Sequence, residues 1–164
     1  MRRSLPFALC TALSALVSTT LAAQTSDSGA FVTRLGTDTV AVERWTRTAG
    51  RLTGDRVLLS PRTELVHYAA TIAPDGRIAS FESASRPGTA LDGPAARSTS
   101  VVFGGDSAEV TVTVGDSTRR YRTAVRRGAV PMLNAVFALY EQLARQAAAL
   151  RADSVGVDMV GTSL

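Results

Sequence analysis

The chain has 164 residues, of which 45% are hydrophobic and 20% are charged, and this composition is typical of a folded globular domain rather than of a disordered chain. It holds 18 basic residues against 14 acidic ones, one histidine and one cysteine. One cysteine excludes an internal disulfide, and one histidine excludes a multi-histidine metal site. If the first 23 residues are removed, 16 basic residues remain against 14 acidic ones, and this excess is too small to indicate nucleic-acid binding.

Residues 1–23 have the order of a secretory signal peptide. Arg2 and Arg3 precede an apolar stretch, Leu5 to Val17, and small residues follow it, with cleavage expected after Ala22 or Ala23. The stretch is shorter than the roughly 20 residues of a membrane-spanning helix. We therefore expect export to the periplasm or the cell exterior, and no transmembrane segment after cleavage.

After a polar spacer at residues 24–29, residues 30–164 are expected to form a single β-rich domain. Short segments alternate apolar with polar residues and are separated by Gly, Asp and Pro, as in antiparallel strands. Residues 85–96, rich in Pro, Gly and Ala, are expected to form an exposed loop. The pattern predicts strands at residues 31–35, 39–47, 51–60, 63–73, 77–83, 98–103, 108–114, 121–125 and 154–160.

One helix is predicted over residues 131–151, with Pro131 at its first position. Polar residues 141, 142, 145 and 146 are expected to face away from the core. Apolar residues recur there at spacings of three and four and form one stripe: Leu133, Val136, Phe137, Tyr140, Leu143, Ala144, Ala147 and Leu150. The expected fold class is mainly β, with a curved antiparallel meander sheet or half-barrel and a single amphipathic helix packed on it.

The sequence contains no pattern typical of a catalytic or metal site, so we expect a non-enzymatic protein without cofactor. His67 is the only histidine, and no Gly-x-Ser-x-Gly motif accompanies it. The Gly-Asp-Ser tripeptides at 105–107 and 115–117 precede Ala or Thr, and no histidine follows them, which favours hairpin turns over a lipase nucleophile. A secreted hydrolase built around His67 is the weaker alternative. A carboxylate pair for glycoside cleavage would have to come from Glu43, Glu64, Glu82 and Glu109.

A curved sheet with one helix across its mouth leaves an apolar cavity wherever the helix does not fill the space. In the simpler interpretation the helix stripe and the sheet face form the core and fill this space, and in the alternative an apolar or lipid-like ligand binds between sheet and helix. The hypothetical lining residues are Tyr68, Val110, Val112, Tyr121, Phe137 and Tyr140. The densest basic cluster, at residues 119–127, is interpreted as a solvated strand and its exit, with binding of anionic headgroups or polyanionic glycans as the alternative.

The second hypothesis is an accessory or protein-interaction module of a larger secreted protein, with another envelope protein as the expected partner. An exposed apolar strip, or an unpaired strand edge at Ser154 to Val160, would favour this hypothesis.

Several segments resemble uncharacterised secreted bacterial proteins, and this resemblance implies secretion and a β-rich fold but no activity and no site residues. Since members of that group can be longer than this chain, two expectations stay open: the chain is a complete small domain, or it is the N-terminal part of a longer protein. The expected architecture resembles the open half-barrels of lipoprotein carriers, in which a helix-covered sheet binds acyl chains. The segments are Arg34-Leu35-Gly36, Asp38–Glu43, Ser60–Thr63, Pro74–Arg77 and Phe137–Glu141.

Overall fold

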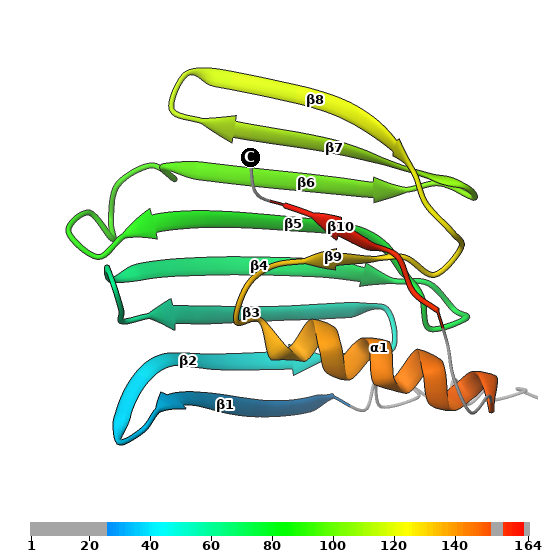
Figure 1. Ribbon diagram of the computed structural model, residues 1–164, viewed down its shortest axis with the longest axis horizontal. Coiled ribbons are helices and arrows are strands. Elements are labelled where there is room, and N and C mark those ends of the chain that lie inside the picture. Colours follow the sequence, from blue (N-terminus) through cyan, green and yellow to red (C-terminus); the bar gives the residue numbers. More distant parts are fainter. Residues whose placement is uncertain (1–25, 152–155, 163–164) are drawn as a thin grey trace, which may run out of the picture.

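The computed structural model describes residues 26–151 and 156–162, so the predicted signal peptide lies outside the described residues. The predicted fold class is confirmed, because eight strands form one antiparallel meander in which each strand pairs with the next along the chain (Figure 1). The sheet is not closed into a barrel. Its strands are β1 (Asp27–Leu35), β2 (Asp38–Arg47), β3 (Arg51–Leu58), β4 (Glu64–Ile72), β5 (Ile78–Pro87), β6 (Arg97–Phe103), β7 (Ser107–Val114) and β8 (Ser117–Ala124).

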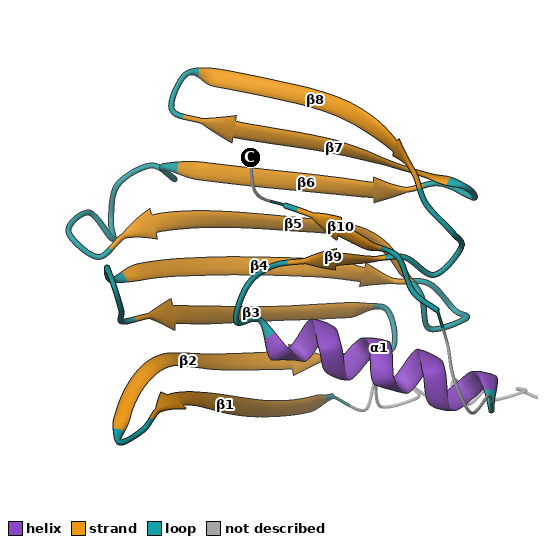
Figure 2. Cartoon of the chain, in the orientation of Figure 1, coloured by secondary structure: helices purple, strands orange, loops and turns teal. Residues whose placement is uncertain are grey.

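Three short elements follow the meander and lie over one face of the sheet, which we name the covered face (Figures 1 and 2). They are β9 (Val130–Met132), α1 (Phe137–Leu150) and β10 (Met159–Gly161). Strands β10 and β9 pair in parallel as a separate two-stranded sheet. The opposite face of the eight-stranded sheet is the uncovered face.

The predicted alternation of side chains places the core on the covered face. In β4, Val66, Tyr68 and Ala70 are buried, whereas His67 is exposed on the uncovered face. This follows from strand geometry, in which successive side chains point to opposite faces. The core continues across the sheet and into the covering elements, and includes Leu52, Phe81, Val101, Val110, Val130, Val136 and Leu139.

The helix begins later than predicted. Pro131 lies in β9 rather than at the first helical position, and α1 begins at Phe137. Pro131 and its neighbours pair with residues 159–161, and this parallel pairing prevails over the proline's preference for a helix start. The predicted last strand, 154–160, is observed only as β10, and residues 154 and 155 lie outside the described part of the chain.

The buried side of α1 also differs from the predicted stripe. Ala138, Leu139 and Gln142 are its buried residues, whereas Tyr140 and Leu150 of the predicted stripe are exposed. Gln142 was expected to face away. It is buried because its Nε2 donates a hydrogen bond of 2.7 Å to the Gly76 carbonyl in the β4–β5 turn.

Further boundaries differ from the sequence prediction, including the start of β8 at Ser117 instead of residue 121. Strand β1 begins at Asp27, so residues 27–29 belong to the sheet rather than to the polar spacer. Strand β5 continues to Pro87, because its residues 85–87 pair with Glu64–Val66 of β4, and the exposed loop is correspondingly shorter.

Candidate ligand-binding pocket beneath the helix

The six predicted lining residues do not come together around a cavity. Tyr68, Val110 and Val112 are at most 1% exposed and belong to the packed core. Tyr121, on β8, donates a hydrogen bond to the Gly161 carbonyl. None of the six lines any of the main pockets in the described part of the chain. The remaining two, Phe137 and Tyr140, lie on α1 with ring centroids 6.2 Å apart.

The N-terminal end of α1 sits directly on the sheet, and a buried carboxylate fixes it there. Glu43 of β2 accepts hydrogen bonds from the backbone N–H groups of Phe137 (2.6 Å) and Ala138 (3.2 Å). These N–H groups have no partner within the helix, and the positive end of the helix dipole favours a carboxylate beside them. The Tyr68 hydroxyl donates a further bond of 2.5 Å to Glu43. Burial, and then this hydrogen bond, raise the pKa of Tyr68.

The opposite end of α1 lies above a pocket of about 390 Å³, which we name the helix-end pocket. The helix contributes one wall, and the β4–β5 turn, the β8–β9 connection and the segment before β10 contribute the others. Its apolar lining comes mainly from Leu143, Ala147, Leu150 and Val157. The first three belong to the predicted apolar stripe, whose C-terminal part therefore lines a pocket, although Leu143 also packs against the core.

Two arginines give the rim of the helix-end pocket a positive charge. Arg77 forms an ion pair with Asp75, and the Arg127 guanidinium lies 3.7 Å from the same carboxylate. Hydrogen bonds from Arg77 hold the pKa of Asp75 below its usual range, so this carboxylate stays ionised. Two guanidinium groups therefore face one carboxylate, which leaves a net positive charge beside the apolar wall.

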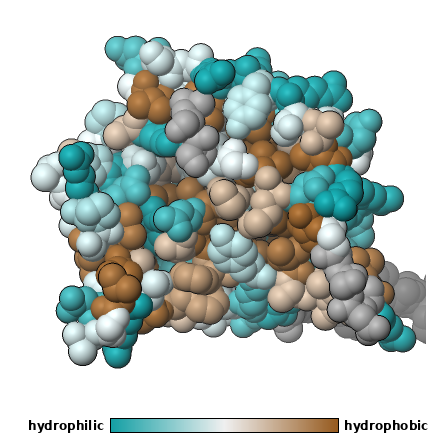
Figure 3. Space-filling model, in the orientation of Figure 1, coloured by the Kyte–Doolittle hydropathy of each residue, from teal (hydrophilic) through white to brown (hydrophobic). Residues whose placement is uncertain are grey.

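A second hollow, of about 530 Å³, adjoins the helix-end pocket and shares Arg77, Arg127 and Gly128 with it. Arg126 also lines this hollow, and its guanidinium pairs with Asp158 at 2.7 Å. The predicted basic cluster is therefore divided between strand β8 and this end of the sheet. Figure 3 shows the covered face, on which apolar patches alternate with hydrophilic ones and do not form one continuous apolar trough.

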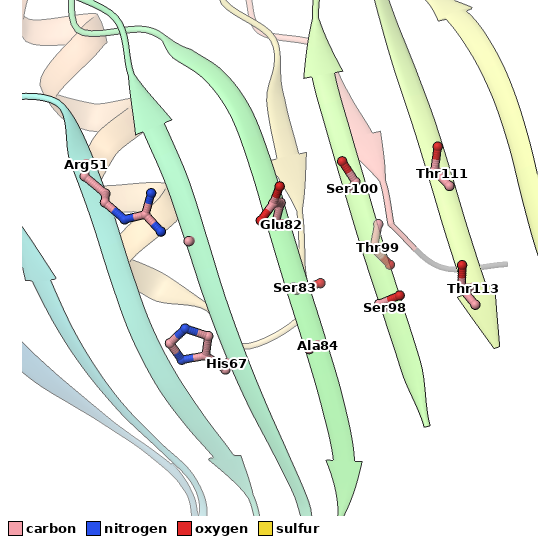
Figure 4. Close-up of a pocket in the computed structure, with 11 residues that line it drawn as sticks. Arg51, His67, Glu82, Ser83, Ala84, Ser98, Thr99, Ser100, Thr111 and Thr113 are labelled. Carbon is pink, nitrogen blue, oxygen red and sulfur yellow. The ribbon is translucent and has the colours of Figure 1, made fainter. Parts of the chain in front are cut away.

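The uncovered face holds a shallow hollow of about 370 Å³ lined mostly by small polar side chains (Figure 4). His67 lies at one side of it and bonds to the Asp55 carboxylate at 2.9 Å. The nearest serine in its row, Ser98, is two strands away through Ala84, a separation of about 10 Å. A serine at that distance does not reach the imidazole, so these residues do not form a Ser-His-Asp arrangement.

Within residues 26–151 and 156–162, no group of three or more His, Cys, Asp or Glu side chains is arranged to hold a metal ion. The helix in this part of the chain has 14 residues and is too short to span a membrane. The chain matches no protein-family model, and we found no significant match to it among curated proteins or among solved structures.

Proposed function

We propose that the chain is an exported, non-enzymatic envelope protein that binds an amphiphile with one acyl chain and an anionic headgroup. The helix-end pocket carries this proposal, because an apolar wall and a positively charged rim lie side by side in it. The predicted signal peptide supports the proposed location. None of the six lining residues predicted from the sequence lines this pocket.

The dimensions of the pocket suit a ligand of this class. A volume of about 390 Å³ is within the range of roughly 300–1,000 Å³ that is typical of small-molecule sites. The acyl chain would lie against Leu143, Ala147 and Val157. Each methylene removed from water contributes about 0.8 kcal/mol, so shortening a bound chain by two carbons weakens binding roughly tenfold.

The polar groups of the pocket suit an anionic headgroup. Arg77 and Arg127 offer charged donors at the rim, and a guanidinium matches the geometry of a carboxylate or a phosphate. Gln146 also lines the pocket. Its Nε2 atom is buried and has no hydrogen-bond partner among the described residues. An oxygen of the bound headgroup would satisfy this donor.

Titration of the purified mature protein with laurate, followed by calorimetry, tests the proposal. Ala147→Trp fills the pocket and is expected to abolish binding, whereas Ala144→Trp, at an exposed position on the same helix, retains it. Arg127→Met is expected to weaken laurate binding about tenfold but to leave binding of the uncharged dodecanol unchanged. Equal laurate affinity in both tryptophan variants would exclude this pocket as the site.

A second candidate function, a protein-interaction module, is favoured by an apolar row on the uncovered face. Val32, Val42, Val57 and Leu65 are direct cross-strand neighbours on β1 to β4, and Val32 is 54% exposed. The occupant we infer is a second copy of the chain, because two such rows interdigitate when sheets pack face to face. Native mass spectrometry over a range of protein concentrations tests this inference. If the protein has the mass of a single chain at all of them, the inferred pairing of two copies is contradicted.

A further inference from the structure

A separate polar pocket lies on the covered face, between the sheet and the segment that precedes α1. Its volume is about 190 Å³, and it is some distance along the sheet from the helix-end pocket, with which it shares no residue. Leu133, Asn134 and Thr162 form its outer wall. Its floor consists of the small side chains of Val66, Ser83, Ser85 and Thr99.

Strand register places two arginines on either side of this floor. Arg56 of β3 pairs with Val66, Val66 pairs with Ser85, and Ser85 pairs with Arg97 of β6. Directly paired residues share one face of a sheet, so both arginines extend from the covered face, three strand spacings or about 14 Å apart at their Cα atoms. The two long side chains therefore flank a space that the short ones between them leave open.

Arg56 is only 3% exposed, and its hydrogen-bonding capacity is incompletely used. One terminal nitrogen donates to the Asn134 carbonyl, and the other donates to Glu64 at 2.9 Å. The Nε atom is buried and has no partner among the described residues. A buried donor without a partner is costly, so an acceptor in the pocket would be bound favourably.

Arg56 faces two carboxylates, Glu64 and Glu43, whereas Arg97 brings a positive charge to the pocket without an ion-pair partner among the described residues. Arg97 donates to the Thr162 carbonyl, and within the described chain no carboxylate lies in ion-pair range of it. Glu64 neutralises one of the two guanidinium charges. Glu43, beside Arg56 on β2, does not line the pocket, and its oxygens already accept bonds from Tyr68 and from the first N–H groups of α1.

We propose that this pocket binds a small oxyanion, with Arg56 and Arg97 on either side of it and the hydroxyl groups of Ser83, Ser85 and Thr99 beneath it. The shared chemistry is a compact group of two or more oxygens with negative charge. Inorganic phosphate and a short carboxylate such as succinate both offer it, and the pocket, at about 190 Å³, has about half the volume of the helix-end pocket.

Calorimetric titration of the mature protein with inorganic phosphate, and separately with succinate, tests this proposal. We expect one of the two to bind at one site per chain. Arg97→Met is expected to weaken that binding at least tenfold, while Arg51→Met, which removes an exposed arginine of the uncovered face, leaves it unchanged. The ligand that binds shows whether the site selects phosphate or carboxylate.

A variant that keeps the side-chain shape covers the case in which Arg97→Met fails to fold. Thr99→Val removes one hydroxyl from the floor, and we expect it to weaken binding severalfold with unchanged circular dichroism. Binding that both variants leave intact would overturn the proposal, and so would the absence of phosphate and succinate binding at millimolar concentration. Ala147→Trp is expected to leave oxyanion binding intact, which separates this site from the helix-end pocket.

Discussion

At the scale of single residues, the contact between Tyr68 and Glu43 joins the sheet to the helix. Tyr68 is fully buried and reaches Glu43 across Gly54 of β3, which pairs directly with Tyr68. A Cβ atom at position 54 would lie 2.3 Å from the Tyr68 oxygen. Only glycine therefore lets the tyrosine ring lie over this strand, and the small residue at position 54 makes the buried hydrogen bond possible.

The raised pKa of Tyr68 predicts how the free energy of unfolding depends on pH. In the unfolded chain this hydroxyl ionises near pH 10, whereas in the folded protein it stays protonated. Ionisation therefore favours the unfolded state. The contribution of the Tyr68 hydroxyl to the free energy of unfolding is complete below about pH 10 and is lost as the pH rises above this value. We expect Tyr68→Phe to lower stability at pH 7 by about 1–3 kcal/mol, because the buried Glu43 loses a donor.

Urea unfolding at pH 7 and between pH 9 and 11 measures both effects. In the wild type, the free energy of unfolding is expected to decline above pH 10. Tyr68→Phe is expected to make this decline shallower, whereas Tyr140→Phe, at a position that is 37% exposed, is expected to preserve it. If the free energy of unfolding declines equally steeply with pH in the wild type and in Tyr68→Phe, the assignment of the raised pKa to Tyr68 is contradicted.

Much of this residue-scale arrangement follows from alternation. Within residues 39–47, period two separates Glu43 and Trp45 from Val42 and Arg44, and the structure places Glu43 and Trp45 on the covered face. Alternation along a strand predicts which face of the sheet a side chain lies on, but it does not predict which residue that side chain contacts. The docking of Phe137 on Glu43 joins residues 94 positions apart, and no local pattern contains that information.

At the scale of elements, the eight sheet strands were predictable from the sequence. The presence of one helix was also predictable, but its first residue and its buried side were not. Each hairpin has its own turn chemistry, such as Gly76 and Gly115, whose positive φ angles suit tight turns. The three-residue strand β9 gives no periodic signal, and the sequence prediction places two of its residues, Pro131 and Met132, in the helix. The orientation of α1 depends on tertiary contacts, since Gln142 is buried by its bond to Gly76.

Two leucines of α1 distinguish the observed helix orientation from the predicted stripe. Leu139 is 2% exposed and lies outside the predicted stripe, whereas Leu150 is 64% exposed and belongs to it. We expect Leu139→Ala to lower the free energy of unfolding by about 2–5 kcal/mol, since it leaves a cavity in the core. Leu150→Ala is expected to change it by less than about 0.5 kcal/mol. Chemical denaturation of both variants checks this, and the reverse order would contradict the observed orientation.

At the scale of the whole molecule, the sheet buries one face and leaves the other without a covering element in the described chain (Figure 2). The N-terminal end of α1 packs directly on the sheet at Glu43, whereas the C-terminal end of α1 leaves the helix-end pocket open. That pocket combines residues from the β4–β5 turn, the β8–β9 connection, α1 and the segment before β10. Four such distant segments have no common sequence signature, so no local pattern indicates this pocket or its lining.

Native mass spectrometry of the mature protein, purified from a periplasmic extract, tests the proposed ligand binding most directly. The account predicts a bound species of lipid-like mass at one per chain in the wild type. This species is released on denaturation, is absent from Ala147→Trp and is retained by Ala144→Trp. A wild-type protein that carries no such species, and that takes up none when laurate is added, would contradict the account.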